Sequence, residues 1–555
     1  MATDSKITIN SSAVSTESPV SIESNEKVKQ DSTPPVPELS ERQKYMATAS
    51  LCLAIFIAGL DNTILATSLP TISNHFNDFT KSSWIITANL VTTTCFQPLY
   101  GKISDIFGHR EAFILAIAIF IISSIISGLA QSITMLICSR ALSGIGGAGI
   151  TVMVQIIISQ IISLRERGKY SGFIGVSWGL SSVVGPLLGG YFTDKVSWRW
   201  CFFINVPIGV ITGTAVLILI KLPHPQGTWK SKVKRIDFVG ITLLLIGLIL
   251  ILLALNFGGV KFAWNSAPTI CLLVFGVVII AAFAYHQYRY PPEPIIPVRM
   301  LSIRNFWAVI SAQFCLGFTF YCLIFFLPLF DSVIYDGSAS QSGLFLLPFV
   351  VSLVVLSVIT GILMTITGKY RMFFRMGSFL VALGTGLMIS IHVGTKKFHF
   401  IIFMILAGFG NGMTNQSLLV CVQASVPKKA IGIATSTAVF IRTFSGAIGV
   451  AIISAVQRTV FSNKVQLIAN EYPQSKQSIL SVVDDSSVIQ NQSLISSAIR
   501  SKILLGYSVS FRVVFIILAA MASLCFVFTL FTQHNHLSRP SKPTTTTLTK
   551  TSEEV

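Results

Sequence analysis

The chain has 555 residues, of which 52% are hydrophobic and only 11% are charged, and its formal net charge is +18. Soluble domains carry about 25% charged residues, so this composition, with a mean hydropathy of +0.73, excludes an ordinary soluble protein. Stretches of roughly 20 apolar residues, long enough to cross a bilayer as helices, recur along the chain. The alternating segments of about ten residues that mark a membrane β-barrel do not. We therefore predict an all-α polytopic membrane protein embedded in a lipid bilayer.

The apolar stretches predict fourteen membrane spans. In chain order they cover residues 47–69, 84–100, 112–130, 133–154, 170–192, 202–221, 236–256, 268–288, 306–330, 343–366, 373–393, 399–422, 431–457 and 511–532. The flanking segments, 1–45 and 533–555, are polar and rich in Ser, Thr and Pro, a composition typical of disordered tails.

The distribution of basic residues predicts which way the chain crosses the membrane. Most Lys and Arg of the connecting segments fall on the side of the N-terminus, and few fall in the opposite loops. Because Lys and Arg concentrate on the cytosolic side, we expect both termini, and both tails, in the cytosol. The positive net charge then reports topology, and we expect no nucleic-acid partner.

The chain contains a weak internal repeat. The end of the tenth span, "GILMTITGKYRMFFRMG", is similar to "PLYGKISDIFGHREAFI" at the end of the second, and "LAGFGNGMTNQ" in the twelfth is similar to "LSGIGGAGITVMVQ" in the fourth; "FSGAIGVAI" in the thirteenth loosely matches "VVGPLLGGYF" in the fifth. Repeated halves are typical of secondary transporters, whose substrate site lies between them. We expect an N-terminal six-helix bundle (46–221), a linker with two extra spans (222–305), and a C-terminal six-helix bundle (306–532) that includes an extracytosolic loop (459–510).

A polar segment, "GKISDIFGHR", interrupts the apolar sequence between the second and third spans. Gly101 and Gly108 permit a tight turn there at little steric cost, and Lys102 and Arg110 suit the cytosolic side. The preference of Lys and Arg for the cytosolic side does not explain the acidic residue Asp105. From spacing alone it is either an ordinary turn aspartate or part of a gate.

Three charged residues fall inside predicted spans: Asp61, Arg140 and Arg442. A charge at the centre of a membrane helix costs about 2.5–3.5 kcal/mol, so such residues are functional by default. Asp61 lies about 12 Å, and Arg140 about 10 Å, from the outer ends of their spans at 1.5 Å per residue. At similar depth they are a candidate proton-coupling pair, or else a static ion pair that locks two helices. Arg442 either lines a cavity or pins the thirteenth span to its neighbours.

The fifth span carries a row of small residues. Glycines four residues apart allow helices to approach closely, and proline favours a kink. The positions concerned are Gly179, Gly185, Pro186, Gly189 and Gly190. They indicate either a sealed, bent interface or a merely structural packing helix.

Other polar residues within the spans are candidates for contact with a polar substrate, or for hydrogen bonds between helices. They are Asn62, Gln313, Asn411, Asn415 and Gln416. In the predicted outer loop, "NQS" places a possible glycosylation site at Asn491.

Several motifs in order resemble one family, the major facilitator superfamily in its fourteen-span drug:proton antiporter branch. They are "LDNTILATSLPTI" (60–72), "GKISDIFGHR", "ICSRALSGIGGAG", "GLSSVVGPLLGGYF", "WRWCFFINVPIG" (198–209) and "FIRTFSGAIGVAI". The resemblance implies two six-helix bundles with two inserted helices, proton coupling through Asp61 and Arg140, and a helix 5 motif that prevents leak.

The resemblance also implies a gate. Asp105 would pair with a nearby arginine and with the N-terminal end of a helix from the other half, whose dipole favours an anion, and so latch the outward-facing state. The segment departs from the family pattern at Ile106 and His109, where basic residues are usual. Its charge network is therefore expected to be thinner than in the family.

The sequence contains no Walker loop and no metal-ligand spacing, so we expect no enzyme activity, no cofactor and no metal site. We predict a monomeric, proton-coupled antiporter that exports small organic molecules such as drugs or toxins, in the plasma membrane. A channel and a nutrient sensor are less favoured. Because "SSWIITANLVTTTCFQPLYGKISDIFG" also resembles fungal vacuolar transporters, the alternative is proton-driven transport of lysine, histidine or arginine across the vacuolar membrane.

Overall fold

The computed structural model describes residues 40–533 except 77, 79–80, 82, 221, 223–224, 226–227, 260–261, 291–292, 297, 338 and 483–495. In this part of the chain the regular secondary structure is helical, and the only β-interaction is an isolated bridge between Gly258 and Phe262. The predicted all-α class is confirmed. The expected glycosylation site at Asn491 and nearly all of both predicted tails lie outside the described residues, although the first helix begins at Glu41, within the predicted N-terminal tail.

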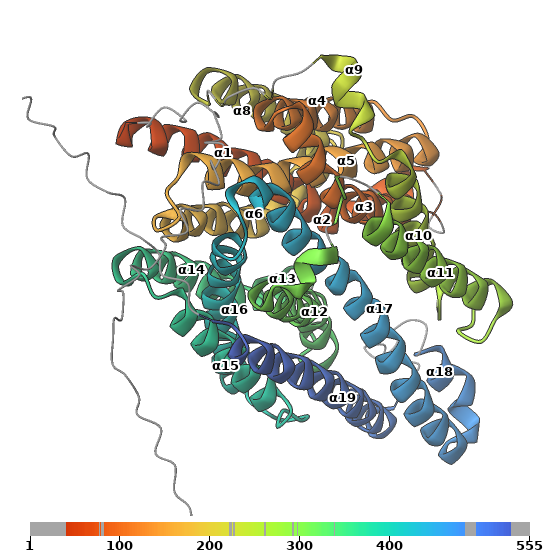
Figure 1. Cartoon of the computed structure of the whole chain (residues 1–555). Helices are drawn as coiled ribbons and strands as arrows, with labels where there is room; N and C mark the ends of the chain where they lie inside the picture. Colours follow the sequence, from red (N-terminus) through yellow and green to blue (C-terminus); the bar gives the residue numbers. More distant parts are fainter. Residues whose placement is uncertain are drawn as a thin grey trace, which may run out of the picture. The chain divides into compact units, whose positions relative to one another are not determined.

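The helices follow the predicted spans in order (Figure 1). The N-terminal half contains α1 (Glu41–Thr63), α2 (Leu65–Phe76), α3 (Ser83–Phe107), α4 (His109–Gly128), α5 (Ile133–Ile161), α6 (Arg167–Lys195), α7 (Trp200–Phe203) and α8 (Asn205–Leu219). The linker contains α9 (Trp229–Lys234), α10 (Phe238–Phe257), α11 (Ala267–Arg289) and the 3-10 helix η1 (Val298–Ser302).

The C-terminal half repeats this organisation. It contains α12 (Arg304–Ile334), α13 (Ala339–Phe345), α14 (Leu347–Thr367), α15 (Tyr370–Met388), α16 (Lys397–Ala424), η2 (Lys428–Ala430), α17 (Ile431–Glu471), η3 (Pro473–Ser475), α18 (Lys476–Ser481) and α19 (Ser497–Leu530).

Twelve helices of the described part are long and apolar enough to cross a membrane by length and composition. Two further helices of spanning length, α3 and α15, coincide with the predicted spans 84–100 and 373–393 but are not among these twelve. The multi-pass character is therefore confirmed, whereas the number fourteen and the cytosolic termini stay predictions.

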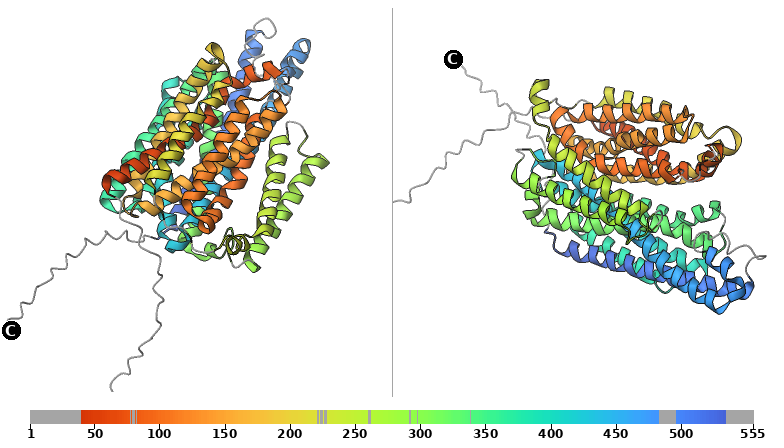
Figure 2. Two further views of the ribbon diagram at one scale, coloured as in Figure 1. Left: turned by 90° about the horizontal axis from the view of Figure 1, so that it is seen from above. Right: turned by 90° about the vertical axis from the view of Figure 1, so that its right-hand side faces the viewer.

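The two halves use the same helix pairings. In the first half α3 and α4 pack on α5, and α1 packs on α6 and α8; in the second, α14 and α15 pack on α16, and α12 packs on α17 and α19. Between the halves, α6 packs on α14 and α3 packs on α17 (Figure 2). These pairs relate α3 to α14, α5 to α16 and α6 to α17, as the sequence repeat predicts. The α10–α11 hairpin lies beside α3 and α17.

The predicted turn between the second and third spans is shorter than expected. Gly108, with φ of 116°, is the only residue between α3 and α4, so it makes the turn as predicted. Gly101 lies within α3 and does not turn the chain, because the helix continues to Phe107. A methyl group at Gly101 would instead collide with Ser436 Oγ of α17, so this glycine serves the close approach of two helices.

In the segment 459–510, predicted as an extracytosolic loop, the described residues are largely helical and form no irregular loop. At 1.5 Å per residue the 41 residues of α17 extend about 61 Å, twice the roughly 30 Å of a hydrocarbon core. Past the end of the predicted span 431–457, α17 and α19 continue to pack through apolar side chains, which include Phe461, Val465, Ile503 and Tyr507. The apolar residues keep a helical spacing past the end of the span, so the helices do not stop there.

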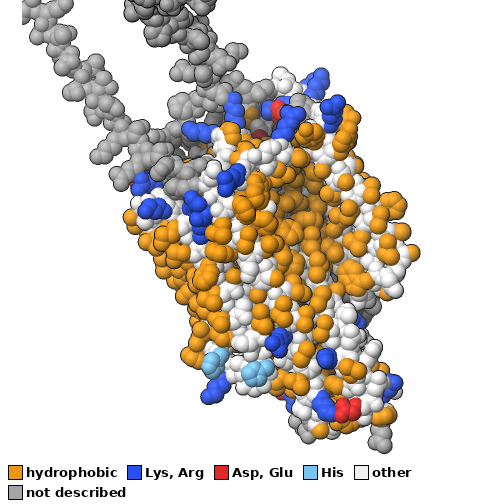
Figure 3. Space-filling model, turned by 60° about the horizontal axis from the view of Figure 1, so that its bottom comes forward, with side chains coloured by type: hydrophobic (Ala, Val, Ile, Leu, Met, Phe, Trp, Pro, Cys, Tyr) orange, Lys and Arg blue, Asp and Glu red, His pale blue; other side chains and the backbone are white. Residues whose placement is uncertain are grey.

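The outer surface of the described part has the character of a lipid-facing protein. On the face in Figure 3, hydrophobic side chains cover the middle and Lys and Arg lie towards the two ends. Large apolar side chains such as Leu187, Ile218 and Ile366 are more than half exposed. Such a band is costly in water and favourable in a bilayer.

Candidate transport site

Asp61 and Arg140 form a buried ion pair between α1 and α5. Arg140 Nη1 donates to Asp61 Oδ1 and Oδ2, both at 2.8 Å, and the side chains are only 2% and 1% exposed. Two charges removed from water require excellent geometry and further hydrogen bonds to be tolerated. The pairing that similar depth in the sequence suggested is therefore present.

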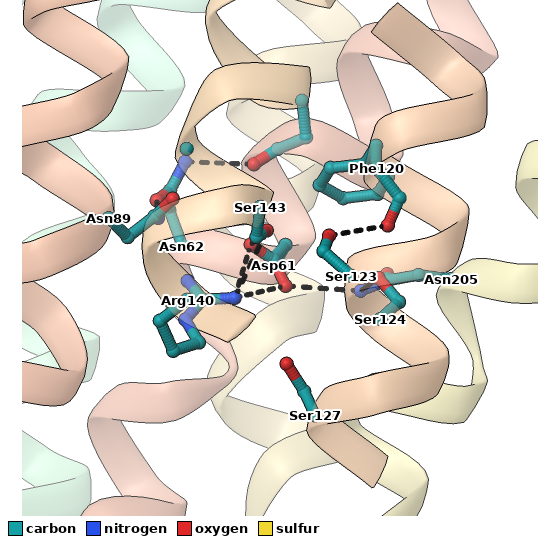
Figure 4. Close-up of polar contacts among 12 residues, drawn as sticks. Asp61, Asn62, Asn89, Phe120, Ser123, Ser124, Ser127, Arg140, Ser143 and Asn205 are labelled. Carbon is teal, nitrogen blue, oxygen red and sulfur yellow. Dashed lines mark hydrogen bonds and ion pairs between the residues drawn. The ribbon is translucent and has the colours of Figure 1, made fainter. Parts of the chain in front are cut away.

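Neighbouring helices complete the coordination of Asp61 (Figure 4). Asn205 Nδ2, at the start of α8, donates to Asp61 Oδ1 at 3.1 Å, and Ser143 Oγ donates to Oδ2 at 3.2 Å. The guanidinium carbon of Arg140 also lies 5.8 Å from the ring centroid of Phe202, within cation–π range. Sequence reasoning missed Asn205 and Ser143, although both lie in quoted motifs; a polar amide within an apolar stretch was the signal at Asn205.

A small polar pocket borders Asp61. It has a volume of about 20 Å³ and is lined by Asp61, Asn62, Asn89, Ser143 and Thr151, among others. A polar site of at least about 10–15 Å³ can hold one water. Asn62 belongs to this pocket, where its Oδ1 accepts from Asn89 Nδ2 at 2.8 Å, and it does not line the central cavity.

A larger cavity of about 140 Å³ lies between the two halves. Its walls come from α1, α5 and α6 of the first half and from α12, α14, α16 and α17 of the second. Four of the six candidate residues line it: Gln313, Asn415, Gln416 and Arg442. Thr151 lines both this cavity and the small pocket beside Asp61, so the two spaces adjoin.

Gln416 and Asn411 also make hydrogen bonds between or within helices. Gln416 Nε2 donates to the Ser171 carbonyl of α6 at 3.0 Å, and this hydrogen bond joins the two halves. Asn411 Nδ2 donates to Ala407 O in its own helix at 3.0 Å.

Arg442 on α17 is held against the cavity wall. Its Nη1 donates to Asn415 Oδ1 at 2.8 Å, and its guanidinium carbon lies 4.7 Å from the ring centroid of Phe320. Among the described residues no carboxylate pairs with Arg442, and its Nε has no hydrogen-bond partner there. Its environment therefore differs from that of Arg140.

Asp105 lies against the N-terminal end of α17, as the gate hypothesis predicts. A Cβ on Gly432, the second residue of α17, would lie only 2.8 Å from Asp105 Oδ1. The structure shows no ion pair between Asp105 and an arginine within the described ranges. Asp105 lies beyond the predicted span 84–100, and its burial raises its pKa to about 7, because burial outweighs the nearby positive charge of Lys102.

The linker supplies a charge cluster that sequence reasoning missed. Glu293 accepts from Lys102 Nζ at 2.7 Å and from Arg235 Nε at 2.9 Å. Burial disfavours its carboxylate, but the hydrogen bonds from Arg235 and Lys102 together outweigh burial and lower the pKa of Glu293. The segment next to Asp105, which lacks the usual basic residue at Ile106, thus obtains its charge partners from the linker.

Further arginines hold the predicted cytosolic end. Arg110 donates to the Leu217 carbonyl near the C-terminus of α8 at 2.6 Å, where unpaired carbonyls favour a cation. Between the halves, Arg167 Nη1 donates to Gln423 Oε1 at 3.2 Å, and Arg165 Nε donates to Thr365 O at 2.9 Å. The two halves are therefore joined by polar contacts at this end.

The glycines of α6 divide into three groups. Methyl groups at Gly185 and Gly189 would collide with Thr63 and Thr67, so these glycines allow α6 to pack on α1 and α2. A methyl group at Gly179 would meet Val354 of α14, in the other half, whereas at Gly190 nothing lies within 4 Å. Pro186 lies inside α6, and its carbonyl accepts from Thr67 Oγ1 at 3.4 Å.

Two similar helix bundles with a cavity between them define a polytopic membrane transporter. The site contains an ion pair, amides and an arginine around a cavity, and the described residues hold no cluster of His, Cys, Asp or Glu suited to a metal. These features are typical of a transport protein.

Comparison with known proteins identifies the family. A Major Facilitator Superfamily model matches residues 51–450. The chain is 37% identical over 417 residues to the "MFS-type efflux pump MFS1" of Arthroderma benhamiae, a match that covers 74% of this chain and 77% of the relative. It is 32% identical over 511 residues to "Efflux pump FUS6" of Gibberella fujikuroi, covering 90% and 91%. The chain belongs to the Major Facilitator Superfamily.

A solved structure agrees with the fold. The human organic anion transporter MFSD10 superposes with a TM-score of 0.57 over 86% of this chain and 99% of that chain, at 14% identity. At such low identity this likeness supports the fold alone.

Proposed function

We propose that this transporter exports small organic molecules, such as drugs or toxins, in exchange for protons. Its fungal relatives are named efflux pumps, which supports export. The observation that carries proton coupling is the position of Asp61, whose carboxylate borders a pocket of about 20 Å³ that adjoins the central cavity at Thr151.

In this mechanism Asp61 carries the proton, and Arg140 pairs with the carboxylate when it is deprotonated. A proton that reaches the carboxylate through a water in the small pocket neutralises Asp61 and weakens its bond to Arg140. The side chains Asn205 and Ser143 hold the carboxyl group in place in both protonation states, since they bond separate oxygens. Each proton that enters down a 100 mV potential supplies about 2.3 kcal/mol.

Alternating access requires one end of the cavity to open as the other closes. At the predicted cytosolic end the halves are joined by Arg167 with Gln423 and by Asp105 against α17. We propose that these contacts latch this end and break when the halves rock. Gly101 and Gly432 allow the latch to form because they remove side chains from the crossing of α3 and α17.

Flux measurements on Asp61→Asn test the coupling. A compound to which the overproduced protein gives a drug-sensitive yeast resistance is first identified, and its flux is then measured in proteoliposomes with an imposed pH gradient. We expect Asp61→Asn to abolish the response to the gradient while exchange of the compound without a gradient persists.

The matched control is Asp331→Asn. Asp331 is also a buried carboxylate, paired with Lys397 Nζ at 3.0 Å, but it does not line the pocket beside Asp61. This variant should keep the response to pH. An unchanged gradient-driven flux in Asp61→Asn would contradict the assignment of Asp61 as the proton-coupling residue.

We further propose that the protein acts as a monomer in the plasma membrane. A C-terminal fluorescent tag should give a ring at the cell surface that coincides with a plasma-membrane marker. A vacuolar rim would instead favour the transport of lysine, histidine or arginine into the vacuole, and uptake of these amino acids by isolated vacuoles would decide it.

A further inference from the structure

We infer that the central cavity binds an organic anion, an apolar or aromatic molecule with one carboxylate, and that Arg442 receives that carboxylate. The inference names the substrate class of the transporter and so rests on the proposed function for its physiological meaning. The binding site itself is argued from the cavity alone.

The first argument is the lack of an acidic partner for Arg442. Asp61 neutralises Arg140 at 2.8 Å, whereas Arg442 makes its one hydrogen bond, within the described ranges, to the neutral amide of Asn415. Arg442 is partly buried and borders the cavity, so its positive charge acts on whatever occupies that space and favours an anion.

The second argument is the free hydrogen-bonding capacity of the guanidinium. A guanidinium offers five N–H donors in a planar fork that matches a carboxylate. Asn415 Oδ1 accepts from one of them, and the ring of Phe320 holds one face of the group at 4.7 Å. Arg442 is therefore fixed in position while most of its donors stay free for a ligand.

The third argument is the composition of the cavity wall. No Asp or Glu is among the described residues that line the cavity. Trp178, Phe320 and Tyr321 give it aromatic surface, and Trp178 and Phe320 lie 5.6 Å apart between ring centroids although they belong to opposite halves. An aromatic carboxylate would place its ring against these side chains and its charge on Arg442.

Amide groups suit the polar edge of such a ligand. Gln155 and Gln313 line the cavity from opposite halves, and the Oε1 atom of each lacks a hydrogen-bond partner among the described residues. Amide nitrogen and oxygen can exchange places by a side-chain flip, so each can donate to a carboxylate or accept from a hydroxyl. The walls thus offer polar contacts without adding negative charge.

The cavity volume limits the ligand in this conformation. At about 140 Å³ the space is smaller than the roughly 300–1,000 Å³ of sites for drug-sized ligands. A single-ring acid is therefore a suitable probe, and larger anions would require the halves to separate further.

The test compares three probes that share one ring and differ in charge: benzoate, benzamide and benzylammonium. Binding to the purified full-length protein in detergent is measured from the rise of its Tm with probe concentration. We expect benzoate to bind at least about tenfold more tightly than benzylammonium, since a hydrogen bond to a charged group is worth that factor or more.

Variants assign the preference to Arg442. Arg442→Gln should lose the advantage of benzoate, and Arg442→Lys should keep part of it, because lysine retains the charge but not the fork. Lys464→Gln is the control, a change of the same kind at an exposed position on the same helix, and should bind all three probes as the wild type does.

Three results would overturn the inference: no binding of benzoate, tighter binding of benzylammonium, or an unchanged benzoate preference in Arg442→Gln. The outcome is separable from that of the coupling proposal. If Asp61→Asn kept pH-driven flux while benzoate still required Arg442, proton coupling through Asp61 would fail and the anion site would stand.

Discussion

Each half of the molecule places an arginine within its helices, but Arg140 is buried and Arg442 is only partly buried beside the cavity. In the first half Arg140 is neutralised by Asp61 and the group is nearly inaccessible, at 1% and 2% exposure. In the second half Arg442 donates to a neutral amide, lies over an aromatic ring, has no carboxylate partner within the described ranges, and lines a cavity of about 140 Å³. The two similar bundles therefore differ: the first contains the buried ion pair of Asp61 with Arg140, and the second presents the side chain of Arg442 to the cavity.

The difference suggests a division of labour. The buried pair of Asp61 and Arg140, beside a pocket the size of one water, suits the binding of a proton. Arg442, in the larger central cavity, suits the binding of a substrate. Thr151 lines both spaces, so the proton site and the substrate site of this proposal adjoin. The following predictions test this contrast.

The largest effect is expected from removing one member of the buried pair. Arg140→Gln leaves the Asp61 carboxylate buried without its counter-ion, and breaking such a pair costs about 3–5 kcal/mol. The measurement is the loss of stability to thermal or denaturant unfolding in detergent. Arg442→Gln is the counterpart in the other half, and it should keep or raise stability because it removes an unpaired charge.

The double variant Asp61→Asn/Arg140→Gln sharpens this prediction. It removes both charges and should recover much of the stability that Arg140→Gln loses, while pH-driven transport stays absent. Equal losses for Arg140→Gln and Arg442→Gln would show that the two arginines do not differ in the way the structure indicates.

The next effect concerns how α6 packs within the first half. Gly185→Ala would place a methyl group against Thr63, and overpacking of this kind costs about 1–3 kcal/mol. Gly190→Ala, five residues further along the same helix, meets nothing within 4 Å and should change stability by less than about 0.5 kcal/mol. If both variants unfolded at the same temperature, the close packing at Gly185 would be unimportant.

A smaller effect is expected at the linker. Glu293→Gln removes the carboxylate that Lys102 and Arg235 share, and since the Glu293 side chain is 34% exposed the loss should be about 0.2–1 kcal/mol. Its effect should shrink in high salt, as expected for a partly exposed pair. A loss that does not depend on salt would argue against an electrostatic role.

The last prediction concerns the pH dependence of stability at Asp105, where the effect depends on the pH of the measurement. Because its folded-state pKa is raised to about 7 from an ordinary value of 3.8, the folded protein binds the proton more tightly than the unfolded chain. Its contribution to stability is therefore greatest below about pH 4 and is lost as the pH rises to about 7. The difference in Tm between wild type and Asp105→Asn should follow this course; a difference that is constant with pH would contradict it.

The sequence predicted much of the fold and part of the site. Long apolar stretches located the helices, because a chain in a bilayer must satisfy its backbone within each span. The rarity of charge in such stretches singled out Asp61, Arg140 and Arg442, and their depth anticipated the pair of Asp61 with Arg140. The short motif repeats anticipated the matching helix pairings of the two halves.

Only the tertiary structure decided which groups meet these residues. Asn205 lies 144 residues from Asp61 along the chain, and Glu293 lies 191 residues from Lys102, so no local spacing connects them. Likewise, Arg442 has no carboxylate partner in the part of the chain that the structure describes, and this depends on how all the helices around it pack. Periodicity and hydropathy fix where a helix lies, because they act along the chain, but partners across a cavity depend on how whole helices pack.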